Sequence, residues 1–223
     1  MHGVPQACDP VRHRGPLARG NVYLAEIAGP DGGFPTWVRG DAPDVDMTGG
    51  ILALAPEARR HARLLMGAME FVLNAQLPDG TFERSWTVSE SSGILRALDA
   101  LHAIPGTALG DRIKVASTRS VARLLAMPNT DGGWGQHADR PSDVLSTAQA
   151  VPALARLGNP LAVSRAVAYL VAHQDPDGGF TSVPDQVGPR PLPFDYPVLT
   201  DIRTLTALRR ASALALPRAK QPR

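Results

Sequence analysis

Cysteine, aromatic residues and long apolar runs are scarce in this sequence, and each shortage narrows what the protein can be. The single cysteine, Cys8, excludes an intramolecular disulfide and a zinc site built from several cysteines. One cysteine in 223 residues fits a reducing, cytoplasmic compartment. Neither sign of charge dominates, since 23 Lys and Arg face 21 Asp and Glu, so the sequence predicts no nucleic-acid partner.

Long hydrophobic segments are also missing. No run reaches the roughly 18 apolar residues of a membrane span, and the first twenty residues lack the apolar core of a secretory signal. We therefore expect a cytoplasmic protein, with peripheral membrane association left open. Residues 1–20 fit neither a helix nor a repeat and are predicted to be irregular. We assign residues 21–216 to one domain and residues 217–223 to a tail.

What the sequence does have is a fourfold repeat. Each copy contains an Asp-Gly turn followed by a glycine or threonine and then an aromatic residue, and the copies lie about 50 residues apart. Asp-Gly suits a turn because the aspartate bonds nearby amides and the glycine accepts a positive φ. The aromatic residue is interpreted as packing over a helix end. The copies are GPDGGF at 29–34, LPDGTF at 77–82, NTDGGWG at 129–135 and DPDGGF at 175–180.

Between the turns the apolar residues recur every three or four positions, which is typical of helices. Ser89 is a candidate N-cap, and no pattern typical of strands competes. The sequence therefore predicts an all-α repeat of helix, loop and helix. The expected helices cover residues 57–76, 89–104, 115–127, 143–157, 161–174 and 198–214.

Gln76 and Gln174 precede two of the turns, and a helix followed by Q-x-x-D-G-x-[FW] resembles the QW repeat of squalene cyclases. From residue 29 to 214 the chain is similar to the carboxy-terminal portion of a class II terpenoid cyclase of the squalene–hopene type. The resemblance implies an α/α toroid. Related barrels are less similar. Protein prenyltransferases need Asp, Cys and His zinc ligands, but the only cysteine here lies outside the repeats, and the GCGEQ-like element of complement-type domains is absent from the sequence.

An acidic motif, APDVDMT, follows the first turn and resembles the DxDD(T) motif of class II cyclases. The resemblance makes Asp46 the Brønsted acid that protonates an alkene or epoxide, with Asp44 as the first aspartate. Met47 occupies the family's third acidic position. The residues alone also allow a structural interpretation, in which Asp44 and Asp46 are turn and N-cap residues before a helix.

Protonating a carbon–carbon double bond requires a carboxyl group that stays protonated at neutral pH. A dry site and a second carboxyl nearby both disfavour ionisation, so paired aspartates suit this chemistry. In the hopene-forming branch a histidine supports the acid, but the matching region near Gly93 has none. Glu90 is the candidate substitute, although an acidic residue at a helix start also simply favours the helix dipole.

Carbocation intermediates are stabilised by aromatic faces. The segment PLPFDYP resembles the family's extended segment that brings aromatics into the cavity, which implies Phe194 and Tyr196 as cavity residues. Trp86 is the third candidate, and Trp134 is interpreted as packing.

A closed ring of six hairpins needs roughly 300 residues, whereas this sequence supplies about four hairpins. We therefore expect an incomplete barrel and a truncated chain. Its open edge would expose apolar helix faces such as the one at 24–27, which predicts self-association, pairing with a second polypeptide or poor solubility.

Three functions follow as hypotheses. The first is proton-initiated cyclisation of an isoprenoid substrate such as squalene or a prenyl diphosphate, without a cofactor, and with magnesium only if the substrate carries a diphosphate. No DDxxD-type motif supports metal-driven ionisation. The second is an inactive helical-repeat fragment or scaffold. The third is a glycoside hydrolase that uses Asp46 and Glu90 as its carboxylate pair.

Overall fold

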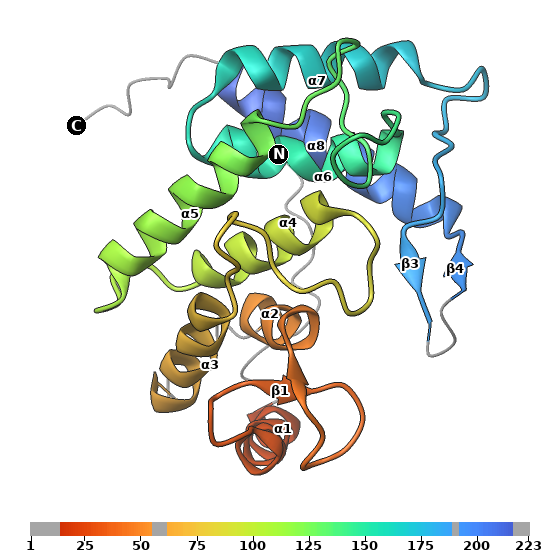
Figure 1. Cartoon of the computed structure of the whole chain (residues 1–223). Helices are drawn as coiled ribbons and strands as arrows, with labels where there is room; N and C mark the ends of the chain where they lie inside the picture. Colours follow the sequence, from red (N-terminus) through yellow and green to blue (C-terminus); the bar gives the residue numbers. More distant parts are fainter. Residues whose placement is uncertain (1–13, 55–61, 189–191, 216–223) are drawn as a thin grey trace.

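A computed structural model describes residues 14–54, 62–188 and 192–215 of the chain. The described residues are predominantly helical (Figure 1). The helices are α1 Arg14–Ile27, α2 Val45–Leu54, α3 Ala62–Asn74, α4 Glu90–Leu101, α5 Gly110–Leu125, α6 Val144–Arg156, α7 Pro160–Ala172 and α8 Pro197–Ala215.

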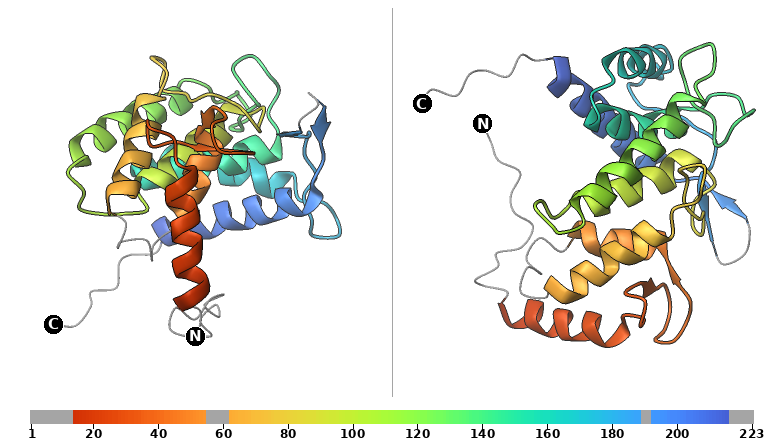
Figure 2. Two further views of the ribbon diagram at one scale, coloured as in Figure 1. Left: turned by 90° about the horizontal axis from the view of Figure 1, so that it is seen from below. Right: turned by 60° about the vertical axis from the view of Figure 1, so that its left-hand side comes forward.

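The helices form two layers. Helices α2, α4, α6 and α8 pack side by side in that order, and α3, α5 and α7 lie outside them (Figures 1 and 2). Fully buried side chains such as Met69, Leu98, Leu124 and Leu154 fill the space between the layers. This arrangement is the expected series of helical hairpins of an α/α toroid. Within the described ranges the hairpins trace an arc that has α2 at one end and α8 at the other.

The four repeat turns share one geometry. In each turn the aspartate Oδ1 accepts a hydrogen bond from the amide two residues further on, at 2.9 to 3.1 Å. The glycine that follows each aspartate has a φ between 85° and 91°, a range that favours glycine over other residues. The predicted chemistry of the Asp-Gly turn is confirmed at Asp31, Asp79, Asp131 and Asp177.

The aromatic residue of each turn is buried, and in three of the four turns, at Phe34, Trp134 and Phe180, its amide donates to a side chain of the next inner helix. The amide of Phe34 donates to Thr48 Oγ1 at 2.8 Å, and the amide of Trp134 donates to Thr147 Oγ1 at 2.9 Å. The Trp134 indole also donates to the Leu124 carbonyl at 2.9 Å. These contacts confirm that Trp134 is a packing residue.

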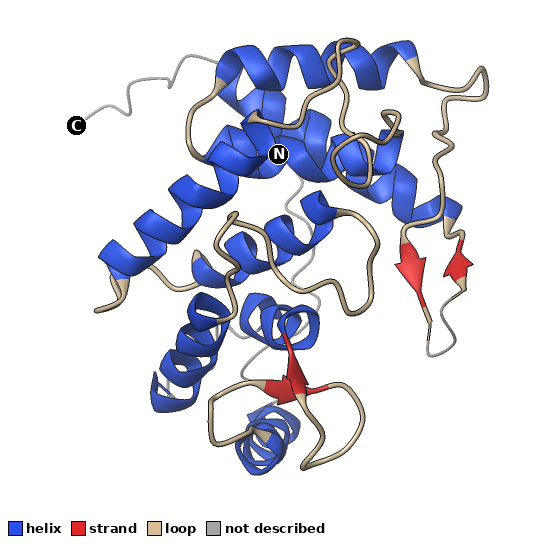
Figure 3. Cartoon of the chain, viewed as in Figure 1, coloured by secondary structure: helices blue, strands red, loops and turns tan. Residues whose placement is uncertain are grey.

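Short strands occur where the sequence predicted none (Figure 3). β1 Phe34–Pro35 pairs antiparallel with β2 Pro43–Asp44, and β3 Gln186–Val187 pairs antiparallel with β4 Pro193–Phe194. Each strand has two residues, which is too short for an alternating apolar pattern to reveal. The first pair lies directly before α2, and the second follows the last repeat turn.

The amino-terminal part of the chain also differs from the expectation. Helix α1 begins at Arg14, inside the stretch that was predicted to be irregular, while residues 1–13 lie outside the described residues. Pro16 falls in its first turn, where proline is compatible with a helix. Residues 57–61 of the helix expected at 57–76, and the tail at 217–223, also lie outside the described residues.

Candidate active site

Asp44 ends β2 and caps helix α2. Its Oδ1 accepts a hydrogen bond from the Met47 amide at 2.7 Å, and its Oδ2 accepts one from the Thr36 hydroxyl at 2.5 Å. The first bond satisfies an amide at the helix start that has no partner within the helix. The N-cap interpretation is therefore correct for Asp44, and the capping bond fixes the direction in which the first turn of α2 presents its side chains.

Asp46 lies in that first turn, and its side chain is only 10% exposed. Its Oδ2 accepts a hydrogen bond from the Trp86 amide at 3.3 Å. Its Oδ1 is buried without a hydrogen-bond partner among the described residues, and the Arg96 Nε lies 3.9 Å away. One carboxyl oxygen is thus buried and not engaged by a hydrogen bond.

The surroundings of Asp46 favour its protonated form. Burial raises the pKa of the Asp46 carboxyl, because desolvation disfavours the charged state. The positive charge of Arg96 and the Trp86 N–H act in the opposite direction, whereas the negative charges of Asp44 and Asp185 raise the pKa further. The net effect is a pKa above the ordinary value of an aspartate.

Trp86 lies beside the acidic motif. Its indole Nε1 donates to the Thr36 hydroxyl at 3.0 Å, and this hydroxyl in turn donates to Asp44. The rings of Trp86 and Trp37 pack edge to face, with their centroids 5.8 Å apart. Asp44, Asp46 and Trp86 therefore form one connected group with an aromatic side.

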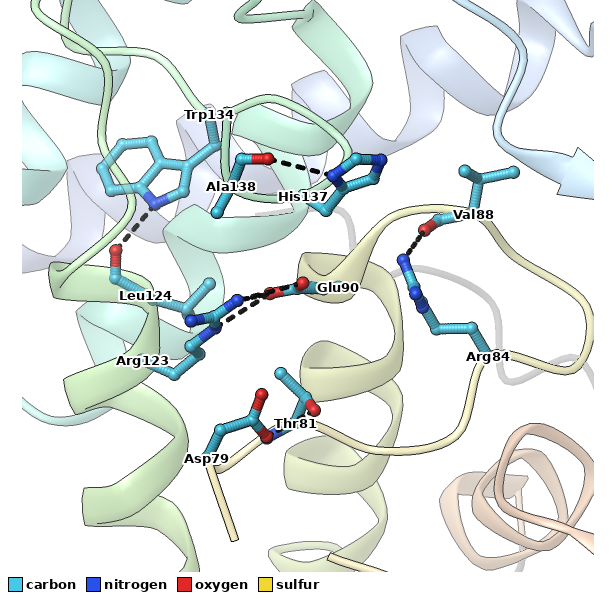
Figure 4. A network of polar contacts seen from close by, with 10 residues as sticks. All are labelled: Asp79, Thr81, Arg84, Val88, Glu90, Arg123, Leu124, Trp134, His137 and Ala138. Atoms are coloured by element: carbon cyan, nitrogen blue, oxygen red, sulfur yellow. Dashed lines mark hydrogen bonds and ion pairs between the residues drawn. The ribbon is translucent and has the colours of Figure 1, made fainter. Parts of the chain in front are cut away.

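Glu90 is directed elsewhere. Its two carboxylate oxygens accept hydrogen bonds from Arg123 on α5, at 3.0 and 3.1 Å (Figure 4). In the described part of the chain, no hydrogen bond or ion pair joins Glu90 to Asp46. The cation beside Asp46 comes instead from Arg96, two turns further along α4.

Phe194 and Tyr196 lie on and just after β4, with their ring centroids 6.5 Å apart. Both rings are largely exposed, at 43% and 55%. The β3–β4 pair is joined to the segment before α4, because the Val187 amide donates to the Trp86 carbonyl at 3.0 Å. The hairpin is thus attached to the loop that contacts Asp46, and the assignment of both rings to the cavity stays a prediction.

Three residues of this site were not identified from the sequence: Thr36, Arg96 and Asp185. Arg96 had the only usable signal, because it lies one turn after Gly93, near the position where the family's supporting histidine was sought. Thr36 and Asp185 reach the site through contacts across the fold, and no local motif marks them.

A hollow of about 720 Å³ lies away from this group. It opens between the end of α5, the third repeat turn and α7, and neither Asp44 nor Asp46 lines it. Among the described residues, no group of three or more His, Cys, Asp or Glu side chains is arranged to hold a metal ion. No described helix is long and apolar enough to cross a membrane.

Solved structures with this fold include an ent-copalyl diphosphate synthase from Streptomyces platensis, with a TM-score of 0.69 and 22% identity over 85% of this chain and 37% of that one. A single-residue variant of the type II terpene cyclase MstE from Scytonema, in complex with its product merosterolic acid A, gives a TM-score of 0.71 at 17% identity, over 92% and 68% of the two chains. At these identities the likeness shows the fold alone.

Relatives in sequence are closer. The chain is 44% identical to a drimenyl diphosphate synthase of Streptomyces showdoensis over 92% of this chain, and 29% identical to a squalene–hopene cyclase of Zymomonas mobilis over 62%. It spans 39% of the length of the first relative and 23% of the second. Residues 38–182 match the family model of the squalene–hopene cyclase C-terminal domain, so the chain belongs to the squalene–hopene cyclase family and corresponds to its carboxy-terminal portion.

Proposed function

We propose that this chain takes part in a class II, proton-initiated cyclisation in which Asp46 is the acid. The observation that carries the proposal is the buried Oδ1 of Asp46, which has no hydrogen-bond partner in the part of the chain that the structure describes, in a setting that raises the pKa of this carboxyl. A prenyl diphosphate is the proposed substrate class, because the relative with 44% identity is named for a diphosphate product. Squalene is the second candidate, on the weaker likeness to a squalene–hopene cyclase.

In the proposed reaction the Asp46 carboxyl gives its proton to a terminal double bond of the substrate. A carbon–hydrogen bond forms, the π bond breaks, and the neighbouring double bond supplies the electrons that close the ring. The final cation loses a proton to a base or to water, so that the reaction consumes no oxidant or reductant. The face of Trp86 would stabilise the positive charge near the acid, and Phe194 and Tyr196 would do so further along the cavity.

Deuterium incorporation tests whether Asp46 supplies the initiating proton. The protein is incubated in D₂O with farnesyl diphosphate, geranylgeranyl diphosphate or squalene, and the products are analysed by mass spectrometry after removal of any diphosphate. We expect a cyclic product that carries deuterium from the initiating protonation. Asp46→Asn should abolish it, while Asp31→Asn in the first repeat turn is the control for a neutralised aspartate outside the site. A product that survives Asp46→Asn contradicts the proposal.

The protonation step itself needs no metal, because the proton comes from a side chain. Magnesium is proposed only as a counter-ion for the diphosphate of a prenyl diphosphate. EDTA should therefore leave the cyclisation of squalene unchanged and weaken only the binding of a diphosphate substrate. Equal loss with both substrates would contradict this division of roles.

The glycoside hydrolase hypothesis loses its second carboxylate, since Glu90 is engaged by Arg123.

The scaffold hypothesis is favoured by an exposed apolar stripe on α8, formed by Val198, Ile202 and Leu205 at 54% to 68% exposure. We propose that this stripe is covered by a second polypeptide or a second copy of the chain. Analytical ultracentrifugation of the protein alone should show self-association, and Ile202→Glu should reduce it. A monomeric wild-type protein would contradict the second copy and leave only a second polypeptide to cover the stripe.

A further inference from the structure

The loop before β3 contains a buried carboxylate, Asp185, which is 2% exposed. Its Oδ1 accepts hydrogen bonds from the Ser89 amide at 2.6 Å and from the Val88 amide at 3.1 Å. Its Oδ2 accepts a third from Gln149 Nε2 on α6, at 3.1 Å. Asp185 thereby holds the backbone that leads into α4, where amides at a helix start have no partner within the helix.

The segment held by Asp185 is the one that contacts the acid. The Trp86 carbonyl accepts a hydrogen bond from the Val187 amide at 3.0 Å, and the Trp86 amide donates to Asp46 Oδ2 at 3.3 Å. Residues 86–89 are therefore bonded on one side to residues 185–187 and on the other side to Asp46. A shift of Asp185 would therefore move the Trp86 amide, from which Asp46 accepts a hydrogen bond.

Gln149 makes this arrangement rigid. Its Oε1 accepts hydrogen bonds from the Ser89 hydroxyl at 2.7 Å and the Ser91 hydroxyl at 3.3 Å, while its Nε2 donates to Asp185. Gln149 is 1% exposed. Because both ends of its amide have partners, the network fixes α4, α6 and the loop before β3 relative to one another.

Charges around the two carboxylates come from several elements. Asp46 faces Asp44 at the start of its own helix, Arg96 from α4 and Asp185. Arg203 of α8 and Asp143 at the start of α6 face Asp185. Asp185 thus adds a negative charge near the acid, in a chain where Met47 occupies the third acidic position of the motif.

We propose that Asp185 is a positioning residue for the acid: it holds the Trp86 amide against Asp46, and its own negative charge acts on Asp46 in a motif whose third acidic position is Met47. This inference rests on the proposed function, in which Asp46 donates the initiating proton. The hydrogen-bonding role and the charge role are separable, because the first needs an acceptor in place and the second needs only a negative charge nearby.

Two substitutions separate the roles. D185N keeps the shape and an oxygen acceptor but removes the charge, whereas D185E keeps the charge and displaces the acceptor. The Asp46 pKa is followed by NMR of protein labelled with ¹³C at the aspartate carboxyls, with D46N identifying the resonance. D185N should lower the Asp46 pKa. D185E should leave it raised and should accelerate amide hydrogen exchange at Trp86 and Ser89.

D143N is the matched control. Asp143 is also a buried carboxylate, caps α6 through the Ser146 amide at 2.7 Å, and is not among the charges that act on Asp46. An Asp46 pKa that is the same in D185N as in D143N would overturn the charge role. If D185N does not fold, D185E decides, since unchanged exchange at Trp86 and Ser89 would overturn the hydrogen-bonding role.

Turnover of farnesyl diphosphate provides a second readout. D185N should lose more activity at alkaline than at acidic pH, because a lower Asp46 pKa depletes the protonated acid first at high pH. A uniform loss at every pH would indicate a structural role only and would contradict the charge role. The NMR titration needs no substrate, so a wild-type protein without turnover contradicts the proposed function and leaves the inference on Asp185 to be judged separately.

Discussion

At the scale of single residues, the proposed protonation depends on two opposing influences on the pKa of Asp46. Burial favours the protonated carboxyl, and the guanidinium of Arg96, with its Nε 3.9 Å from Oδ1, favours the carboxylate. An acid that must protonate an alkene benefits from both, because it has to carry a proton at neutral pH and also release it readily. Arg96 lowers the pKa of this carboxyl and so favours release of the proton, whereas burial raises the pKa and favours its retention.

Replacing Arg96 by methionine should therefore raise the Asp46 pKa further. We expect activity to persist to higher pH but with a lower maximal rate, because the proton is held more firmly. Carboxyl ¹³C NMR and the pH dependence of turnover measure the two effects. Arg96→Lys retains the positive charge and should lie between the wild type and Arg96→Met. An unchanged Asp46 pKa in Arg96→Met would show that the guanidinium does not influence the acid.

Gly93 lies inside α4, at the position where the inner helices α2 and α6 have the hydroxyls of Thr48 and Thr147. A Cβ at Gly93 would lie 3.8 Å from the Glu83 carbonyl, an ordinary contact. Gly93→Ala should stabilise the protein by about 0.5–1 kcal/mol in chemical denaturation. Gly49→Ala in α2 is the control, because its Cβ would lie 3.3 Å from the Arg96 carbonyl and part of the gain should be lost.

At the scale of elements, the four repeat turns have the same hydrogen bonds but different room around their glycines. Gly32 and Gly178 both have positive φ, at 88° and 91°. A Cβ on Gly32 would lie 2.3 Å from the backbone of Gly67 on α3, whereas a Cβ on Gly178 meets only the end of the Gln174 side chain, at 4.0 Å. The first turn is therefore packed against a helix at its glycine, whereas the last turn is open at Gly178.

Gly178→Ala should cost about 1–2 kcal/mol, the usual penalty for a left-handed residue with a side chain. Gly32→Ala should cost more, because the clash with Gly67 adds to the same backbone penalty. Urea denaturation of both variants separates the two contributions. Equal losses would mean that α3 moves away from the first turn without a penalty.

The predictability of these elements follows from the range of the interactions that form them. The turns at Asp31 and Asp79 and the N-cap at Ser89 depend on contacts within a few residues, so the sequence was sufficient. The first half of helix α1 was missed because its single proline and its glycines suggest irregular chain and its apolar stripe is weak. The contacts of Asp185 cross nearly a hundred residues, and no local pattern encodes them.

At the scale of the whole molecule, buried groups on different helices link folding to pH in opposite directions. Burial raises the pKa of Asp143, whose Oδ2 is buried without a hydrogen-bond partner among the described residues. Burial lowers the pKa of His102, which shares a hydrogen bond of 2.9 Å with Ser117 across α4 and α5. As the pH rises, the native state therefore keeps the proton on Asp143 to a higher pH than the unfolded chain does. As the pH falls, the native state takes up a proton on His102 only at a lower pH than the unfolded chain.

The unfolding free energy should consequently respond with opposite signs in two pH windows. As the pH rises from 3.8 towards the native pKa of Asp143, the unfolded chain ionises first, so the wild type should lose stability relative to Asp143→Asn and then stay level. As the pH falls from 6.5 towards the native pKa of His102, the unfolded chain is protonated first, so the wild type should lose stability relative to His102→Gln. Urea denaturation across the pH range measures both differences. Curves that run parallel to the wild type for either variant would show that the pKa of that residue is the same in the folded and unfolded states.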